Sequence, residues 1–426
     1  MRQLLFPLLL FTFVANAQTY TSYRTGAPES VTTAPRGGSC LMGGATEDDN
    51  AMRWFLQRAD GGDVVVLRAS GSDGYNAYFY SELGATLNSV ETLVLHEAAA
   101  TQEAYVRQRI AEAEAIWLAG GNQATYVSEW RGAQGLDSLV NAAVNERNAV
   151  IGGTSAGMAI LGRGYFSAAN GTITSAEALT DPFDAAVTVD TTAFLHLPYL
   201  DRVLTDTHFD NPDRRGRHAA FLARLYAADA PFRGIACDEY TAVCIDENGQ
   251  ARVFGGFPTY DDYAYFVRPN CAIAEGEPEI LTPGSALTWD RNGTALSVHR
   301  LEGTAGGTQT FDLTDWSTDD GTHLFWSVND GMFNEQEATA AACLPPTSTR
   351  EIMAADWQIF PQPVSLSFAL RSERDKKESP LQLYDWRGRI VRTWPAAQPS
   401  YSVADLPAGT YFLRRRNSGK TLFIQR

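Results

Sequence analysis

Residues 149–161 read AVIGGTSAGMAIL, and this stretch says most about the class of fold. Its first residues, Ala149-Val150-Ile151, form a short apolar run of the kind that is buried in a parallel sheet. Residues 152–157 then form a turn of small residues, and Met158-Ala159-Ile160-Leu161 is compatible with a helix. A strand, a tight turn and a helix in this order predict an α/β unit. Such units form their sites in loops at the carboxyl ends of strands.

The turn itself carries a candidate nucleophile. Gly153-x-Ser155-x-Gly157 is the nucleophile-elbow pattern, in which a strained strand-to-helix turn lifts a hydroxyl clear of its neighbours. Small residues on both sides allow the turn and the close approach of a substrate. The backbone amide of Ala156, at the start of the helix, can face a developing oxyanion. A glycine-rich turn with an incidental serine is the alternative when this motif is taken alone.

Apolar runs and helical stretches alternate around this turn. The run Asp63-Val64-Val65-Val66-Leu67 is rich in β-branched residues, as expected for a strand buried on both faces of a parallel sheet. Further strands are predicted over residues 92–95 and 115–118, and helices over residues 104–113 and 136–147. This alternation predicts a layered α/β sandwich with a mainly parallel sheet.

The pattern changes after about Ala272, where short strands lie between Gly- and Asp-rich turns. Pro345-Pro346 and Pro361-Gln362-Pro363 bracket a linker, and the short strands beyond it predict a small β-sandwich. The strands predicted after the change lie at 295–298, 308–311, 324–328, 381–384, 390–391, 411–413 and 421–424. We therefore expect a catalytic domain at residues 18–275, a β-rich extension at 276–347, and a linker with a C-terminal β-sandwich at 348–426.

The charge supports a separate C-terminal module. The 426 residues include 34 Lys and Arg against 50 Asp and Glu, for a formal net charge of −16. Residues 364–426 hold 12 basic and 5 acidic residues, which leaves 22 basic and 45 acidic residues in 1–363. The total thus divides into +7 and −23. The acidic balance argues against nucleic-acid binding, which requires a basic face to neutralise phosphates.

Residues 1–17 have the pattern of a signal peptide. Arg2 precedes an apolar run from Leu4 to Val14, and Ala15-Asn16-Ala17 is the small-x-small pattern that signal peptidase cleaves. We expect cleavage after Ala17 and export; a buried N-terminal strand or helix is the alternative. No other stretch approaches the roughly 18 apolar residues that a membrane span requires, so none is expected.

Export makes disulfides possible, but the cysteine count is odd. The five cysteines allow at most two internal pairs, and sequence alone leaves the pairing open. Cys237 and Cys244 lie close in sequence, and Cys271 with Cys343 would bracket a subdomain. Neither the cysteines, which include Cys40, nor the six scattered histidines show zinc-ligand spacing. We expect no metal and no other cofactor.

A serine nucleophile requires a base, and His208 is the best candidate. It lies in Asp206-Thr207-His208-Phe209, ahead of Arg214-Arg215-Gly216-Arg217. These arginines could hold a substrate carboxylate bidentately. Asp238-Glu239 offers an acid that could orient the histidine. A structural histidine with solvent-facing arginines is the alternative.

A second glycine-rich run follows the strand predicted at 115–118. In Gly120-Gly121-Asn122-Gln123, consecutive glycine amides can form a concave anion-binding nest. Gly121 could therefore supply the second oxyanion donor, beside Ala156. Taken alone, such a run is more often a turn than a site.

Four of these motifs, in this order, resemble peptidase family S51, which contains cyanophycinase and the aspartyl dipeptidases. The motifs lie at 120–123, 152–157, 206–209 and 238–242, within about residues 38–271. The resemblance implies a class I glutamine amidotransferase-like three-layer α/β sandwich. It also implies a triad of Ser155 as nucleophile, His208 as base and Glu239 as acid. The positions that it assigns to the substrate site are Gln123, Asp206, Arg214 and Arg217.

Two positions depart from the cyanophycinase-like pattern. Such sequences carry three arginines after His-Phe, and Pro212 stands where the first would be. Thr207 stands where cyanophycinase has Gln. Both departures bear on the substrate, and neither touches the triad.

The tail resembles the C-terminal sorting domain of the type IX secretion system. The matching blocks are Phe360-Pro361-Gln362-Pro363, Leu383-Tyr384-Asp385-x-x-Gly388 and Leu406-Pro407-Ala408-Gly409-Thr410-Tyr411, although the first departs from the usual Tyr-Pro-Asn-Pro. The resemblance implies export through the periplasm by the type IX machinery, to the cell surface or the medium. An accessory binding β-domain is the alternative.

The motifs and the targeting segment predict a secreted serine hydrolase, and the resemblance implies a peptidase that hydrolyses Asp-containing amide bonds. The β-Asp-Arg bonds of cyanophycin or related peptides are the candidate substrates. A secreted non-catalytic binding protein on a peptidase-like scaffold is one alternative, and an esterase is another. An α/β-hydrolase has the order Ser…Asp…His, however, whereas the predicted acid here follows the base.

Overall fold

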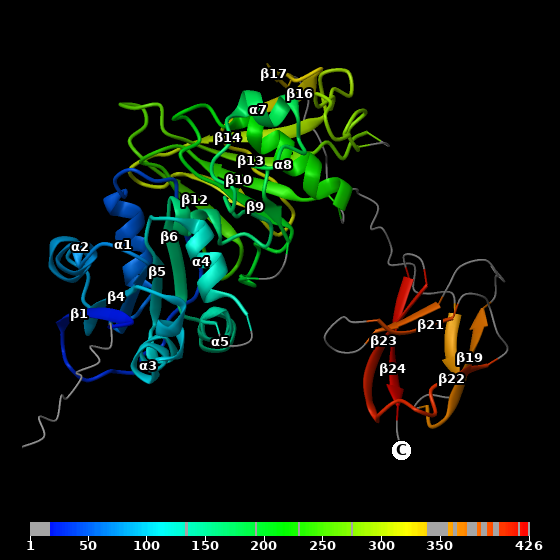
Figure 1. Cartoon of the computed structure of the whole chain (residues 1–426), viewed down its shortest axis with the longest axis horizontal. Helices are drawn as coiled ribbons and strands as arrows, with labels where there is room; N and C mark the ends of the chain where they lie inside the picture. The colour runs from blue at the N-terminus through cyan, green and yellow to red at the C-terminus, as the bar shows by residue number, and fades with distance from the viewer. Residues whose placement is uncertain are drawn as a thin grey trace, which may run out of the picture. The chain divides into compact units, whose positions relative to one another are not determined.

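The computed structural model describes residues 18–132, 135–191, 194–228, 231–273, 276–338, 357–360, 364–372, 381–384, 390–394, 400–415 and 418–424. The predicted signal peptide at 1–17 therefore lies outside the described residues. The chain separates into two compact units, Met1–Ala342 and Cys343–Arg426 (Figure 1).

The first unit contains a nine-stranded sheet in the order β1-β4-β3-β5-β6-β2-β11-β12-β15. Its centre, from β4 to β2, is parallel, as predicted, and the strands at both sides are antiparallel. The strands are β1 (Tyr20–Gly26), β2 (Ser39–Met42), β3 (Asp63–Arg68), β4 (Ser89–Leu95), β5 (Ala115–Leu118), β6 (Val150–Thr154), β11 (Ala242–Ile245), β12 (Gln250–Phe254) and β15 (Gln309–Asp312).

Helices cover both faces of this sheet. On one face, Val64 and Val66 of β3 share a buried cluster with α1 (Asp49–Gln57) and with the π-helix η1 (Tyr78–Glu82). On the other face, Val65 and Leu67 pack in a cluster with α3 (Ala104–Glu112), α4 (Gln123–Trp130) and α5 (Asp137–Arg147). The two faces of one strand thus enter two different cores, which confirms the predicted three-layer α/β sandwich (Figure 1). Two short helices, α2 (Gly74–Ala77) and the 3₁₀-helix η2 (Ala98–Gln102), lie in the loops after β3 and β4.

A six-stranded sheet, β17-β16-β14-β13-β10-β9, completes the first unit. Residues of α7 (Ser175–Thr180) and α8 (Arg215–Ala228) share a buried cluster with it. Its strands are β9 (Val203–Asp206), β10 (Arg233–Cys237), β13 (Tyr263–Pro269), β14 (Leu296–Glu302), β16 (Thr322–Asn329) and β17 (Met332–Glu337). A small sheet pairs β7 (Tyr165–Phe166) with β8 (Val189–Asp190), and α6 (Ala156–Ala159) follows β6.

The predicted boundary between residues 275 and 276 does not separate two sheets. β14 pairs with β13 across this boundary, and β15 joins the nine-stranded sheet through β12. The strands of the β-rich extension therefore complete the sheets of the catalytic region. Local strand signals indicated the strands, but they could not indicate these long-range partners.

The second unit contains two antiparallel sheets around one core. One has the order β18-β19-β22 and the other β21-β20-β23-β24. Phe368 and Tyr401 of the first sheet share a buried cluster with Leu383 and Leu413 of the second. This arrangement confirms the predicted β-sandwich. The strands are β18 (Trp357–Phe360), β19 (Ser367–Ser372), β20 (Leu381–Tyr384), β21 (Ile390–Trp394), β22 (Tyr401–Ser402), β23 (Gly409–Arg415) and β24 (Ser418–Ile424).

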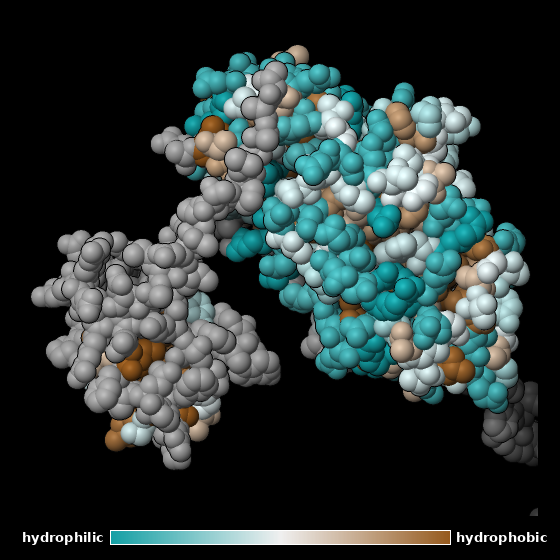
Figure 2. All heavy atoms as spheres, turned by 180° about the vertical axis from the view of Figure 1, so that it is seen from behind, coloured by the Kyte–Doolittle hydropathy of each residue, from teal (hydrophilic) through white to brown (hydrophobic). Residues whose placement is uncertain are grey.

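The visible face of the first unit is mostly hydrophilic, with apolar residues scattered over it (Figure 2). Exposed large apolar side chains include Tyr240 and Tyr260, which are 51% and 67% exposed. Within the described part of the chain, no helix combines the length and apolar character that crossing a bilayer would require.

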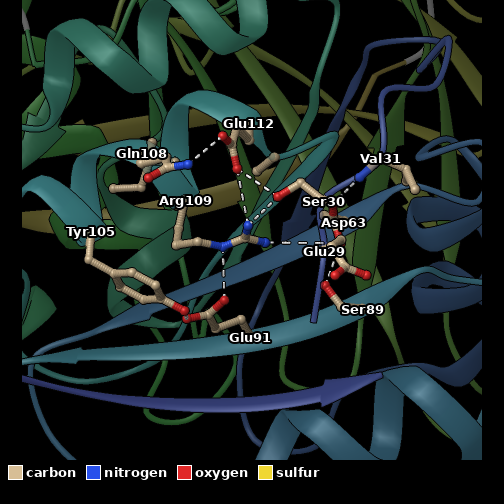
Figure 3. A network of polar contacts seen from close by, with 12 residues as sticks. Glu29, Ser30, Val31, Asp63, Ser89, Glu91, Tyr105, Gln108, Arg109 and Glu112 are labelled. Carbon is tan, nitrogen blue, oxygen red and sulfur yellow. Dashed lines mark hydrogen bonds and ion pairs between the residues drawn. The ribbon is translucent and has the colours of Figure 1, made fainter. Parts of the chain in front are cut away.

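A buried polar network links β3 and β4 of the large sheet to α3 (Figure 3). Asp63 and Glu91, on neighbouring strands of the large sheet, are fully buried. Glu91 accepts hydrogen bonds from Arg24 Nη1 at 3.0 Å and from Arg109 Nε at 2.9 Å. Tyr105 also donates to Glu91, at 2.8 Å. The buried carboxylate of Glu91 is thus satisfied by arginines from β1 and α3, which holds the strand and the helix against the sheet. Asp63 instead accepts hydrogen bonds from the backbone N–H of Val31 at 3.0 Å and from Asn88 Nδ2 at 2.8 Å.

Candidate active site

Ser155 lies at the carboxyl end of β6, between that strand and α6. Its backbone has φ 52° and ψ −119°, a strained conformation of the kind expected at a nucleophile elbow. Its backbone N–H donates to Met42 O at the end of the adjacent strand β2, at 3.2 Å. A Cβ on Gly157 would lie 2.0 Å from Leu118 O, so the small residue at that position is a steric requirement. The sequence pattern therefore corresponds to a real constraint on the turn.

His208 follows β9, a strand of the other sheet of the unit. Its backbone N–H donates to Gly43 O at 2.8 Å, and its φ is 47°. A Cβ on Gly44 would lie 2.4 Å from the imidazole ring. The loop after β2 therefore contacts both the backbone and the ring of His208 and fixes their position. Neither Gly43 nor Gly44 belongs to a motif identified in the sequence, although a glycine pair directly after a strand is a signal for close backbone approach.

The three residues predicted as a triad form a continuous chain of hydrogen bonds. His208 Nε2 lies 2.8 Å from Ser155 Oγ, and His208 Nδ1 lies 2.6 Å from Glu239 Oε1. The side chains of His208 and Glu239 are 22% and 17% exposed, so they are accessible but largely shielded. When Nδ1–H donates to the carboxylate, Nε2 is left free to accept the proton of Ser155. This arrangement can activate a hydroxyl for attack on a carbonyl carbon.

Two neighbours that sequence analysis missed hold Glu239. Asn211 Nδ2 donates to Glu239 Oε2 at 3.2 Å, and the backbone N–H of Glu239 donates to Asp210 Oδ1 at 2.8 Å. Burial acts to raise the pKa of Glu239, but the hydrogen bonds from His208 and Asn211 outweigh it and lower the pKa. Glu239 thus stays ionised. The only sequence signal for Asn211 and Asp210 was their position directly after the His-Phe pair.

Asp206 and Arg217, predicted to shape the substrate site, form a buried ion pair. They are 3% and 4% exposed, and Arg217 Nε donates to Asp206 Oδ2 at 3.3 Å. His218 Nδ1 lies 3.5 Å from the same carboxylate. Burial acts to raise the pKa of Asp206, but the charges of Arg217 and His218 outweigh it and lower the pKa. Asp206 Oδ1 also accepts the backbone N–H of Thr207 at 2.9 Å, next to His208.

Arg214, in contrast, lies half-buried near the triad. Its Nη1 donates to Thr207 O at 2.8 Å. Among the described residues, no carboxylate forms a hydrogen bond or ion pair with it. Burial lowers the pKa of Arg214, and the nearby charge of Arg217 lowers it further. A guanidinium in this setting favours an anionic partner.

The glycine-rich loop after β5 also reaches the nucleophile. A Cβ on Gly120 would lie 3.5 Å from the Cβ of Ser155, so this backbone runs directly beside the serine. Gly121 is packed against Tyr126, whose hydroxyl donates to Gly120 O at 3.1 Å. Ala156 is buried directly after Ser155, and Gln123 begins α4 with its side chain partly exposed. The structure therefore brings this loop and the elbow together, while the oxyanion and substrate roles stay predictions.

Within the described residues, no group of three or more His, Cys, Asp or Glu side chains could hold a metal ion. Cys40, Cys237 and Cys244 are free and buried, whereas Cys271 is disulfide-bonded. Cys343, the possible partner of Cys271, lies outside the described residues.

Two segments of the chain match known families of proteins. Residues 49–253 match peptidase family S51, and residues 358–425 match the secretion system C-terminal sorting domain. The sorting domain indicates export through the secretion machinery to the cell surface or the medium. No match was found among curated proteins.

Two solved structures are similar to part of the chain. A peptidase from an acI-B1 Actinobacterium has 13% identity and a TM-score of 0.37, over 52% of this chain and 89% of its own. A provisionally assigned peptidase E protein from Listeria monocytogenes EGD-e has 14% identity and a TM-score of 0.31, over 52% of this chain and 99% of its own.

Proposed function

We propose that this protein is a secreted serine peptidase with a catalytic triad of Ser155, His208 and Glu239. Its residues 49–253 match peptidase family S51. The observation that carries the proposal is the hydrogen-bond chain of 2.8 Å and 2.6 Å from Ser155 Oγ through His208 to Glu239. The sorting domain makes the protein an exported one. No metal or cofactor enters the proposal.

The chemistry is acyl transfer in two steps. Ser155 Oγ attacks the scissile carbonyl carbon while His208 Nε2 takes its proton, and the ionised Glu239 stabilises the imidazolium. The oxyanion is stabilised by backbone amides, for which Ala156 and Gly121 are our candidates. His208 then gives the proton to the leaving amine, which departs and leaves an acyl-enzyme. Water attacks that ester with His208 again as the base, and Ser155 is restored.

We further propose that the substrate is an Asp-containing peptide, with β-Asp-Arg bonds of cyanophycin or related peptides as the candidate. The support for a substrate carboxylate is Arg214, which is half-buried near the triad and forms no ion pair within the described chain. Gln123 is a second candidate contact. The excess of acidic residues in positions 1–363 favours a substrate that also carries positive charge, such as an arginine side chain.

The triad is tested with Ser155→Ala and with the exposed Ser128→Ala as a matched control. We expect Ser155→Ala to lower kcat/KM on a β-Asp-Arg dipeptide by at least about 10³-fold and to abolish labelling by a fluorophosphonate. Ser128→Ala should behave as the parent. Unchanged hydrolysis by Ser155→Ala would refute the nucleophile. A parent that hydrolyses no peptide and takes no label would favour the alternative of a binding protein on a peptidase-like scaffold.

The substrate class is tested separately, with pairs of peptides that differ only in Asp against Asn. The parent should prefer the Asp peptide, and Arg214→Met should lose this preference. Arg215→Met is the matched control, because Arg215 already pairs with Asp213 at 2.8 Å. Equal rates on both peptides in the parent would contradict Asp specificity and leave the triad standing. A preference for ester over amide substrates would favour the esterase alternative.

A further inference from the structure

Two free cysteines lie in contact across two strands of the nine-stranded sheet. Cys40 is in β2 and Cys244 is in β11, and the two residues are direct partners in the antiparallel register. Their Sγ atoms are 3.5 Å apart, and both residues are fully buried. The two positions are 204 residues apart in the chain, so sequence spacing did not indicate the contact.

The register of the two strands favours the backbone geometry that a disulfide requires. Directly opposed residues of an antiparallel pair have Cα atoms about 4.5–5.5 Å apart, which lies inside the range of about 4.4–6.8 Å for disulfide-bonded cysteines. Both side chains enter the same buried cluster, together with Trp117, so they project from the same face of the sheet. For a bond to form, the Sγ atoms must approach from 3.5 Å to a bonding distance of about 2.05 Å.

The third free cysteine, Cys237, lies on the opposite face of the large sheet and therefore cannot pair with Cys40 or Cys244. Cys237 belongs to β10 in the other sheet, and its side chain enters the cluster on the opposite face of the large sheet. There it donates weakly to Leu41 O at 3.6 Å. Leu41 is the neighbour of Cys40 in β2, and successive residues of a strand point to opposite faces. The fold thus selects one pair among the three thiols.

We propose that Cys40 and Cys244 form a disulfide in the exported protein. The two thiols lose two protons and two electrons to the disulfide of an exported thiol oxidase, which is reduced to its dithiol as the new S–S bond forms. Two observations support oxidation in this chain: Cys271 is already disulfide-bonded, and the sorting domain shows export. Neither depends on the proposed peptidase activity.

Burial restricts when this bond can form. Burial raises the pKa of Cys244 well above its ordinary value, so the reactive thiolate is scarce once the sheet has closed. The thiols also have no exposed surface for an oxidase to reach. The disulfide therefore forms during folding after export, and it resists reduction in the native protein.

The bond would join two strands that frame the candidate active site. β2 leads into Gly43 and Gly44, which contact His208, and β11 begins three residues after Glu239. A covalent link between Cys40 and Cys244 holds the supports of the base and the acid at a constant separation. The disulfide would thus hold together the two strands beside the candidate active site without contacting the reacting atoms.

The test compares full-length protein secreted into an oxidising compartment with the same chain made in a reducing cytosol. Both are denatured in guanidinium, alkylated with iodoacetamide and digested without reductant for peptide mass mapping. In the secreted protein we expect Cys237 alkylated and a linked peptide joining Cys40 to Cys244. In the cytosolic protein we expect all three alkylated. Alkylation of both Cys40 and Cys244 in the secreted protein would overturn the proposal, as would a link from either residue to another cysteine.

Two variants sharpen the result. Cys40→Ala should leave Cys244 alkylated together with Cys237 after secretion. The matched control Cys237→Ala should retain the peptide that links Cys40 to Cys244. Because Cys237 is the only one of the three expected to be alkylated in the parent, this variant should show no alkylated cysteine among them. If Cys40→Ala is not secreted, the peptide mass map of the secreted parent still shows whether Cys40 and Cys244 form a disulfide or remain two free thiols. The readout is chemical, so a failure of the proposed peptidase activity would not change it.

Discussion

Asp238 provides a sharp test of the electrostatics beside the candidate triad. It precedes Glu239, and its side chain is only 2% exposed. Asp238 Oδ2 accepts the backbone N–H of Tyr263 at 3.1 Å, while Oδ1 is buried without a hydrogen-bond partner among the described residues. Burial raises the pKa of Asp238 to about 8, and the nearby charge of Asp210 adds to the shift. The carboxyl is therefore mostly protonated at neutral pH.

This shift links stability to pH with a definite sign. The unfolded chain ionises Asp238 near its ordinary pKa of 3.8, whereas the native state keeps the proton up to about pH 8. Between these values the native state binds one proton more than the unfolded state, so the free energy of unfolding falls as the pH rises. The slope for one proton is about 1.4 kcal/mol per pH unit, or about 3 kcal/mol between pH 5 and pH 7.

Asp238→Asn removes this titration. The absolute stability of the variant also changes, by about 1–3 kcal/mol, because a buried amide requires partners of its own. The decisive quantity is therefore the difference in slope. We would measure guanidinium unfolding by tryptophan fluorescence at four pH values from 5 to 8, with the exposed Asp319→Asn as a control that makes the same change in formal charge.

Between pH 5 and pH 7 the free energy of unfolding of Asp238→Asn should fall less steeply with pH than that of the parent, by about 1.4 kcal/mol per pH unit. This difference in slope should shrink toward pH 8, where Asp238 of the native parent itself ionises. Asp319→Asn should run parallel to the parent. Parallel curves for Asp238→Asn and the parent would show that Asp238 is ionised in the folded protein and would refute the reasoning.

Three further outcomes follow from the contacts described. Glu239→Gln should lower kcat about 10²–10⁴-fold in steady-state assays, because the imidazolium of His208 loses its counter-charge; an unchanged kcat would remove Glu239 from the proposed triad. Asn211→Ala loses the hydrogen bond to Glu239 and should lower kcat about 3–10-fold with Tm unchanged, because Asn211 is exposed; a lower Tm with an unchanged kcat would instead indicate a structural role. Arg109→Met leaves the buried Glu91 with fewer partners, so the free energy of unfolding from guanidinium denaturation should fall by about 3–5 kcal/mol; an unchanged midpoint would contradict this account of the network in Figure 3.

Local sequence patterns predicted much of the first unit. The run 63–67 became β3 (Asp63–Arg68), and the helix predicted over 104–113 became α3 (Ala104–Glu112). These elements were predictable because hydrophobic periodicity and β-branched composition act within a few residues of the chain. The helix predicted over 158–161 was placed less well: α6 is Ala156–Ala159 and begins directly at the elbow.

Long-range pairing was not predictable in this way. β15 joins one sheet of the first unit and β14 the other, although both come from the single region predicted as a β-rich extension. A strand signal contains the alternation of side chains but does not specify the partner strand. The partner depends on which edges the rest of the fold leaves open.

The candidate site shows the same division. The turn around Ser155 could be predicted from the sequence, because a tight strand-to-helix turn requires glycines at specific positions. The contact of His208 with Ser155 joins residues 53 apart, and its contact with Glu239 joins residues 31 apart. The first contact depends on how the two sheets pack together, and the second on the parallel pairing of β9 with β10 within one sheet.

The arginines after His208 required the tertiary structure most. In the sequence, Arg214 and Arg217 were equivalent candidates for a substrate carboxylate. The fold buries Arg217 in an ion pair with Asp206 and leaves Arg214 half-exposed near the triad. Their difference arises from the direction in which each side chain leaves the start of α8, and direction is set by packing. The sequence alone therefore determined the class of fold and the residue types of the site, whereas packing of distant segments determined which of these residues meet.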